Sequence, residues 1–296
     1  MFAQQMLNGL VVGSVYALFS LGFTLVFGLH KIINLAHGAV FMAGAFIALY
    51  AVQAGLPLWL AFTLSVLGSG TLSVLVELTA FRHLHRSGEA EFGAIISSMG
   101  ANLILITAAQ QISNTQVMRF PYDTFPVVIL DLAGLRVSAL QLFMLACSVG
   151  LVLVLTAGLY RSGFGRQVRA VVGNERAAKL VGVNPNIVYF QTFFCAGALA
   201  GAAGVLVGFA FNSIHFMMGE PFLLRSFVVI VLGGLGSVPG ALAGSLLFGV
   251  CQTLAIAYLP SGLTDAVIFS ILFLALLVLP NGLFGSAAAG LVRGRR

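Results

Sequence analysis

Charged residues are scarce in this sequence of 296 residues. Only 7% of the residues are Asp, Glu, Lys or Arg, whereas 60% are hydrophobic; a soluble domain carries about 25% charged residues. So few polar side chains cannot cover a water-soluble surface. A membrane-spanning helix needs about 20 mainly apolar residues, and the sequence offers about eight or nine such stretches. We therefore expect an all-α polytopic membrane protein with a single transmembrane domain over residues 1–296.

Catalytic and ligand-binding patterns are missing as well. The apolar stretches contain no paired carboxylates, no His-x-x-x-His and no Cys-x-x-Cys, and the chain has no Gly-x-x-x-x-Gly-Lys-Ser/Thr phosphate loop. The three cysteines lie inside apolar runs without metal-ligand spacing. The net charge of +6 resides in short loops rather than in a stripe beside aromatic residues, which argues against nucleic acid as a partner. We expect no enzyme activity, no metal site and no cofactor bound by this chain.

Nine apolar stretches are the candidate membrane spans, with at least one of them broken or re-entrant. The first contains no Lys or Arg before residue 30, so we interpret it as a retained span and not as a cleaved signal peptide. Residues 223–258 run through a glycine-rich segment and fit either two short spans or a re-entrant half-helix followed by a full span. The candidate spans are 6–29, 35–53, 57–79, 92–112, 138–160, 188–211, 223–237, 240–258 and 263–280.

The basic residues favour one orientation. With the N-terminus outside and nine crossings, eleven of the fourteen Lys and Arg residues fall in inner segments, as the positive-inside rule requires. This predicts an N-terminus on the outer side of the membrane and a C-terminus in the cytoplasm. The eleven are Lys31, Arg82, Arg86, Arg161, Arg166, Arg169, Arg176, Lys179, Arg293, Arg295 and Arg296.

Two polar connections between spans are long. The outer one, residues 113–137, contains two prolines and a short apolar run, and could form a small hairpin on the membrane surface that serves for docking. The inner one, residues 161–187, has a helix-forming stretch from Arg166 to Leu180 that stops at Gly182 and Pro185. We expect a short amphipathic helix there, along the cytoplasmic face.

The interior of the spans is nearly free of charge. Glu77 lies near the end of the third candidate span, close to Arg82 and Arg86, and is expected at the inner interface. Coupled ion transport normally places an ionisable residue near mid-membrane. A proton-driven or sodium-driven mechanism therefore has no obvious carrier here.

Two glycine-interrupted apolar segments, one in each half of the chain, are the candidate solute path. Their helix-breaking residues free backbone groups that need partners in the protein or in a water-lined cavity. Close helix packing through small residues is the alternative explanation for both segments. The candidate path residues are Asn34, His37, Gly38, Met42, Gly233, Gly234, Gly236, Ser237 and Gly240.

A series of motifs begins at Asn8-Gly9-Leu10 and runs through Gly13, Tyr16, Gly22, Gly28 and the Asn34-to-Gly38 block. In these motifs the sequence resembles the branched-chain amino acid ABC transporter permeases of the LivH type, and the resemblance extends further along the chain. It continues through Glu77 with Arg82 and Arg86, although His83 and His85 alter the usual Arg-Pro-Leu-Arg at that point. It then covers the segment from Gly165 to Val183 and the glycine-rich segment Gly233–Gly240. Nearly the whole chain is covered, in one order.

The resemblance implies an import permease whose ATP is hydrolysed by partner subunits. Its partners would be a second related permease, two ATP-binding subunits and a periplasmic substrate-binding protein, which sets most of the selectivity. The alternatives are a urea or short-chain amide permease of the same family, and an autonomous channel or secondary transporter. Coupling to the ATP-binding subunits is expected at a smooth face rimmed by basic residues, made of Arg166, Arg169, Asn174, Glu175, Ala177, Ala178, Lys179 and Gly182.

Overall fold

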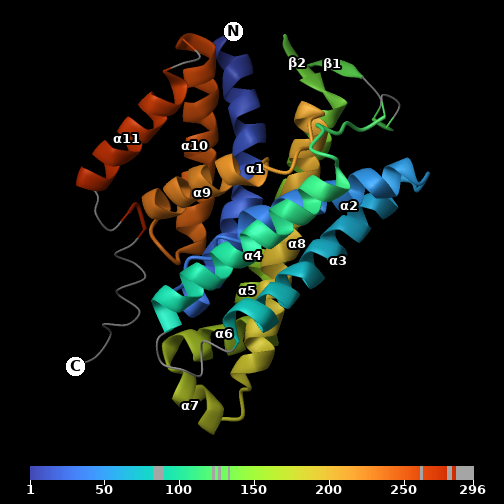
Figure 1. The fold of residues 1–296 in the computed structure, drawn as a ribbon. Helices are drawn as coiled ribbons and strands as arrows, with labels where there is room; N and C mark the ends of the chain where they lie inside the picture. The colour runs from blue at the N-terminus through green and yellow to red at the C-terminus, as the bar shows by residue number, and fades with distance from the viewer. Residues whose placement is uncertain are drawn as a thin grey trace.

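The computed structural model describes residues 1–82, 90–121, 124–125, 128–132, 134–260, 263–278 and 282–284. Helices make up most of this part of the chain, and the only sheet in it is a two-stranded hairpin. Figure 1 shows a bundle of long helices, with the hairpin β1–β2 and the N-terminus at one end and the short helices α6 and α7 at the other. The expected all-α polytopic fold is confirmed.

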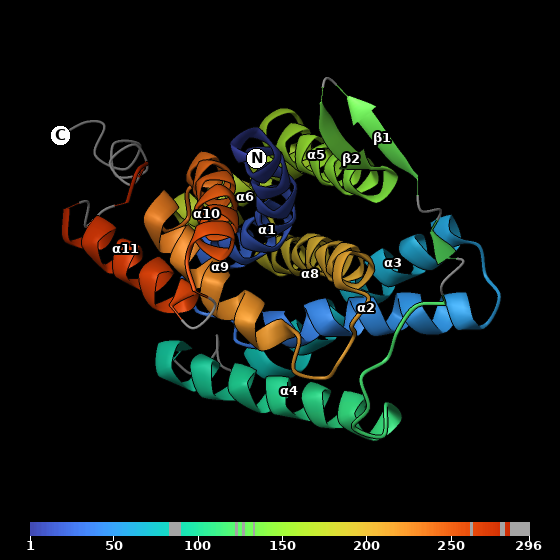
Figure 2. The same cartoon turned by 90° about the horizontal axis from the view of Figure 1, so that it is seen from above.

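Helix α1 (Phe2–His30) stands at the centre of the bundle, with α5, α8, α9 and α10 packed around it (Figure 2). Its 29 residues rise about 44 Å, more than the roughly 30 Å of a bilayer's hydrocarbon core. The other long helices are α2 (His37–Gln53), α3 (Leu58–Val76) with the π-helical turn η1 (Glu77–Phe81), α4 (Ala90–Ile112), α5 (Ala139–Arg161), α8 (Pro185–Phe211), α9 (Gly219–Gly233), α10 (Val238–Tyr258) and α11 (Thr264–Val278).

Each of the nine predicted spans corresponds to one of these helices. Six helices in the described ranges are long and apolar enough to cross a membrane: α1, α3 with η1, α4, α5, α8 and α10. Helices α2, α9 and α11 have only 17, 15 and 15 residues. The ambiguous segment 223–258 forms two helices, and α9 begins at Gly219 and rises only about 22 Å.

Small residues let the helices approach closely. Gly44 of α2 lies against Gly201 of α8, and Gly201 in turn lies against Ser69 of α3. The Ser65 hydroxyl donates a hydrogen bond of 2.6 Å to the Gly44 carbonyl oxygen. In α1, Gly13 packs against the backbone of Gly249 in α10. Contacts of this kind replace the hydrophobic driving force that is missing between helices in lipid.

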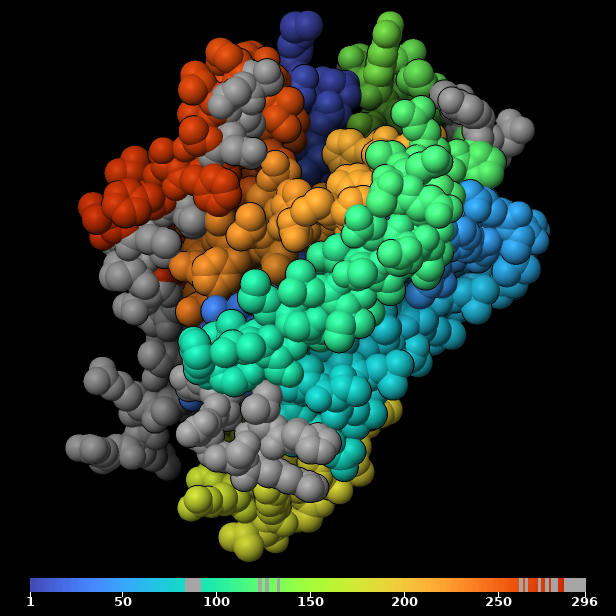
Figure 3. Space-filling model, in the orientation of Figure 1, coloured from blue at the N-terminus to red at the C-terminus, as the bar shows by residue number. Residues whose placement is uncertain are grey.

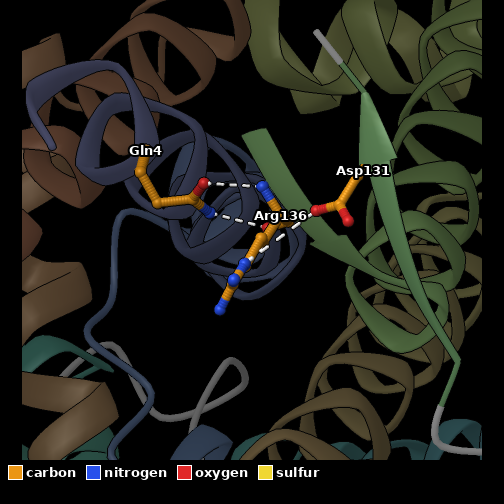
Figure 4. A network of polar contacts seen from close by, with 3 residues as sticks. All are labelled: Gln4, Asp131 and Arg136. Carbon is orange, nitrogen blue, oxygen red and sulfur yellow. Dashed lines mark hydrogen bonds and ion pairs between the residues drawn. The ribbon is translucent and has the colours of Figure 1, made fainter. Parts of the chain in front are cut away.

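At the N-terminal end, the hairpin β1 (Ile129–Leu132) and β2 (Leu135–Ser138) confirms the predicted small hairpin. The Gln4 side chain of α1 binds β2 through both of its polar atoms (Figure 4). Its Nε2 donates to the Arg136 carbonyl oxygen at 2.8 Å, and its Oε1 accepts from the Arg136 amide at 3.0 Å. Arg136 also forms an ion pair across the hairpin, with 3.9 Å between its Nε and Asp131 Oδ1. The hairpin is therefore fastened to α1.

At the opposite end, the single helix expected over Arg166–Leu180 is wrong: the segment forms two helices, α6 (Gly163–Gly173) and α7 (Glu175–Leu180). Asn174 ends α6 with an extended backbone and caps α7, since its Oδ1 accepts a hydrogen bond of 3.0 Å from the Ala177 amide. An asparagine favours such a cap over a helix interior. The two short helices protrude at the lower end of the molecule (Figure 3).

Candidate functional site

Asn34 shapes the turn that begins α2. Its side chain is buried, and its Oδ1 accepts a hydrogen bond of 3.1 Å from the Ala36 amide. Its carbonyl oxygen accepts a further bond of 3.3 Å from the His37 amide. The Asn34 side chain, which was predicted beside the solute path, therefore accepts a hydrogen bond from the neighbouring backbone in this conformation.

His37 is fully buried between α1 and α8. Its Nε2 donates a hydrogen bond of 3.2 Å to the carbonyl oxygen of Phe19, and its ring packs edge-on against the Phe19 ring at 4.6 Å. A Cβ at Gly22 of α1 would lie 3.1 Å from the His37 ring and 2.8 Å from the Ala196 carbonyl oxygen of α8. Gly22 thus leaves the space that the imidazole fills.

Gly38 marks the crossing of α2 with α9. A Cβ there would meet the carbonyl oxygen of Gly219 at 2.9 Å. A shallow depression opens beside this crossing, lined by residues that include Asn102 and Ile106 of α4. Met42, one turn further along α2, is buried in the main apolar core.

The segment Gly233–Gly240 forms the turn between α9 and α10. The backbones of Gly233 and Gly240 lie directly against each other. Gly234 and Gly236 have φ angles of 102° and 80°, which residues with a side chain rarely adopt. Ser237 begins α10, because its Oγ accepts a hydrogen bond of 3.2 Å from the Gly240 amide.

The two predicted path segments share α1 and α9 as neighbours but do not form one cluster. His37 lies beside Gly22 in the middle of α1, whereas Gly236 lies beside Gly28 near its end. Gly236 is exposed, and the other path residues are buried. Gly219, which lies against Gly38, was not among the predicted path residues, although a glycine between a polar loop and an apolar run is the same signal that selected Gly38.

The predicted coupling residues lie on α6, α7 and the turn that follows. Glu175 and Lys179 form an ion pair of 2.7 Å one helical turn apart. Arg166 and Arg169 are exposed, and Gly182 takes a positive φ of 84°.

Ala178 was expected on the face that meets a partner, and this is wrong in the described structure. Its side chain is 4% exposed and packs with Val171, Val188 and Tyr189 of the same chain. The exposed apolar residues are Leu180 and Val181, at 89% and 77% exposure. The six-residue α7 turns Ala178 inward, whereas Ala177 and the C-terminal end of the helix are exposed.

The comparison with known sequences decides the family. A profile described as "Branched-chain amino acid transport system / permease component" matches residues 5–279. The protein belongs to this family. The permease is 32% identical to the high-affinity branched-chain amino acid transport system permease protein BraD of Pseudomonas aeruginosa, and 31% identical to LivH of Escherichia coli K12. Each alignment covers 96% of both chains.

Among solved structures, an inward-facing putative metal-chelate type ABC transporter has a TM-score of 0.49 to this permease at 21% identity, covering 92% of this chain and 85% of that one. As a member of its family, the permease is therefore a multi-pass membrane protein that carries out transport and is not an enzyme. It works together with other components of a transport system.

Proposed function

We propose that the permease is one transmembrane subunit of an ATP-driven importer of leucine, isoleucine and valine. The observation that carries this proposal is the end-to-end match, over 96% of both chains, to permeases named for high-affinity branched-chain amino acid transport. The complex would contain a second related permease, two ATP-binding subunits and a periplasmic substrate-binding protein.

The proposed orientation places the N-terminus and the hairpin in the periplasm and α6 and α7 in the cytoplasm of a bacterial inner membrane. The two sets of residues lie at opposite ends of the bundle (Figure 1). Five basic residues fall between Arg161 and Lys179, and the positive-inside rule assigns such a segment to the cytoplasm. The C-terminus, which the sequence assigns to the same side, lies outside the described residues.

The proposed docking surface for an ATP-binding subunit is the end of α7. Leu180 and Val181 expose nearly their whole side chains there, and Arg176 and Lys179 on the same short helix are exposed beside them. An apolar centre with a charged rim is the usual anatomy of a protein interface. Ala178 supports this surface from beneath by holding α7 on α8.

The proposed solute path passes the segments Asn34–Met42 and Gly233–Gly240. In the present conformation the contacts Gly38–Gly219 and Gly233–Gly240 are closed backbone to backbone. A path there requires α9 to move relative to α2 and α10. Glycine contacts suit such a movement, because no side chain has to change rotamer when the backbones slide.

The deciding experiment reconstitutes the permease with its co-encoded partner subunits in vesicles that contain ATP. We expect ATP-dependent accumulation of radiolabelled leucine when the loaded binding protein is added outside. Competition by urea or acetamide but not by isoleucine or valine would move the assignment to the amide branch of the family. Uptake by the permease alone, without ATP-binding subunits, would show an autonomous transporter instead.

A further inference from the structure

Helix α7 is joined to the membrane helices by a polar contact as well as by apolar packing. The Tyr189 hydroxyl of α8 donates a hydrogen bond to the carboxylate of Glu175, the first residue of α7. The same carboxylate forms an ion pair with Lys179, with 2.7 Å between Glu175 Oε1 and Lys179 Nζ. Glu175 thus connects the two ends of α7 with α8.

The Tyr189 ring continues this connection to α1. It lies 4.4 Å from the His30 ring, at the last residue of α1. His30 in turn packs edge-on against Phe193 at 5.2 Å, one turn further along α8. A displacement of Tyr189 would therefore push directly against the C-terminal end of α1.

The third helix in contact with this cluster is α3, through its π-helical end. Phe81 of η1 packs against Phe193 at 5.4 Å. The Glu77 carboxylate, at the start of η1, is 4% exposed and close enough to act electrostatically on the Tyr189 hydroxyl. Glu77 is buried among the helices of the chain, and its place at the inner interface of the membrane stays a prediction. Single π-helical turns inside α-helices are frequent at functional sites.

We propose that Tyr189 is the positioning residue that carries movement of α7 to the inner ends of α1 and α3. The inference rests on the proposed function, in which an ATP-binding subunit moves α7. Apolar packing alone would need only the aromatic ring, and phenylalanine would supply it. The hydroxyl adds a directed contact with Glu175, so that α7 and α8 shift together and the rings of His30 and Phe193 follow.

The test separates coupling from assembly by measuring leucine imported per ATP hydrolysed in the reconstituted complex. Tyr189→Phe keeps the ring contacts and removes the hydroxyl. We expect the complex to assemble and to hydrolyse ATP at a rate within about twofold of the unaltered protein, with at least a fivefold lower transport ratio. Tyr160→Phe is the matched control, because Tyr160 is an exposed tyrosine near the C-terminal end of α5. The amount of leucine imported per ATP should not change in this variant.

Variants of Glu175 test the same contact from its exposed side, where misfolding is not expected. Glu175→Ala should lower the ratio as Tyr189→Phe does, Glu175→Gln should restore much of it by keeping an acceptor, and the double variant Glu175→Ala with Tyr189→Phe should be no worse than either single one. Unchanged ratios, or losses that multiply in the double variant, would overturn the inference while the proposed function stands. Lack of ATP-dependent uptake by the unaltered complex would overturn both.

Discussion

The backbone of Gly38 in α2 lies against the backbone of Gly219 in α9, with 2.9 Å between the position of a Cβ on Gly38 and the Gly219 carbonyl oxygen. Because the obstacle is backbone, an added methyl group cannot be accommodated by a rotamer change. We expect Gly38→Ala to destabilise the protein by about 1–3 kcal/mol through overpacking and to slow transport. Gly100→Ala is the control, since a Cβ at Gly100 of α4 meets no atom within 4 Å. Thermal unfolding in detergent and leucine uptake measure the two effects, and equal behaviour of the two variants would contradict the close contact.

A charge at the end of α7 should break the contact with the ATP-binding subunit. Leu180→Glu leaves the fold of the permease intact, because Leu180 is 89% exposed. In a buried interface an unpaired carboxylate costs about 3 kcal/mol, which is about a hundredfold in affinity. Co-purification of the ATP-binding subunit measures the loss. The same change at Val117, exposed in the outer segment, should leave co-purification normal. If the Leu180→Glu variant still co-purified with the ATP-binding subunit, α7 would not be the docking surface.

Ala178→Glu should fail for a different reason. The new carboxylate would lie among Val171, Val188 and Tyr189, and an unpaired buried charge costs several kcal/mol. We expect α7 to detach from α8, so that hydrogen exchange of the α7 amides becomes faster in the isolated permease. Leu180→Glu should leave that exchange unchanged. Equal protection in both variants would show that Ala178 does not anchor α7.

Removal of the Gln4 amide should loosen the outer hairpin. Gln4→Ala deletes two hydrogen bonds to the Arg136 backbone, each with a net contribution of about 0.5–1.5 kcal/mol. We expect hydrogen exchange at the Arg136 amide to rise by about tenfold. Gln5→Ala is the control, because the Gln5 side chain bonds Asn8 and not the hairpin. An unchanged rate at Arg136 would mean that the strand is held by other contacts.

The orientation can be checked by thiol labelling in intact cells. Arg119→Cys, between α4 and the hairpin, and Arg176→Cys, in α7, introduce exposed thiols. The hairpin and α7 lie at opposite ends of the bundle (Figure 1). A reagent that cannot cross the membrane should label residue 119 in intact cells and residue 176 only after permeabilisation. The reverse pattern would invert the proposed topology.

The helices were predictable from the sequence because length and hydropathy alone define a membrane span. The break at Asn174 was not, since Ala, Arg and Lys on either side favour one helix, and a single side-chain cap at the Ala177 amide decides otherwise. The start of α9 at Gly219 was missed for a related reason. Glu220 and Pro221 looked like loop residues, but both are accepted in a first helical turn.

The candidate sites were predicted in their segments and only partly in their side chains. Glycine-rich motifs located the places where α2, α9 and α10 touch, since only glycine allows backbones so close. Inward and outward faces were not predictable on α7, because six residues are too few for a periodic pattern and alanine fits either environment. The contact between Glu175 and Tyr189 joins two helices of different direction, which no spacing in the sequence encodes.

The central position of α1 has a consequence for biosynthesis. The helix is made first, yet the glycine face that carries Gly9 and Gly13 is covered by α10, which begins about 200 residues later. At about 5–20 residues per second, this delay amounts to about 10–40 s. Until then the glycine face must be covered by lipid or by another protein. Chains that stop short of Val238 would keep that face uncovered.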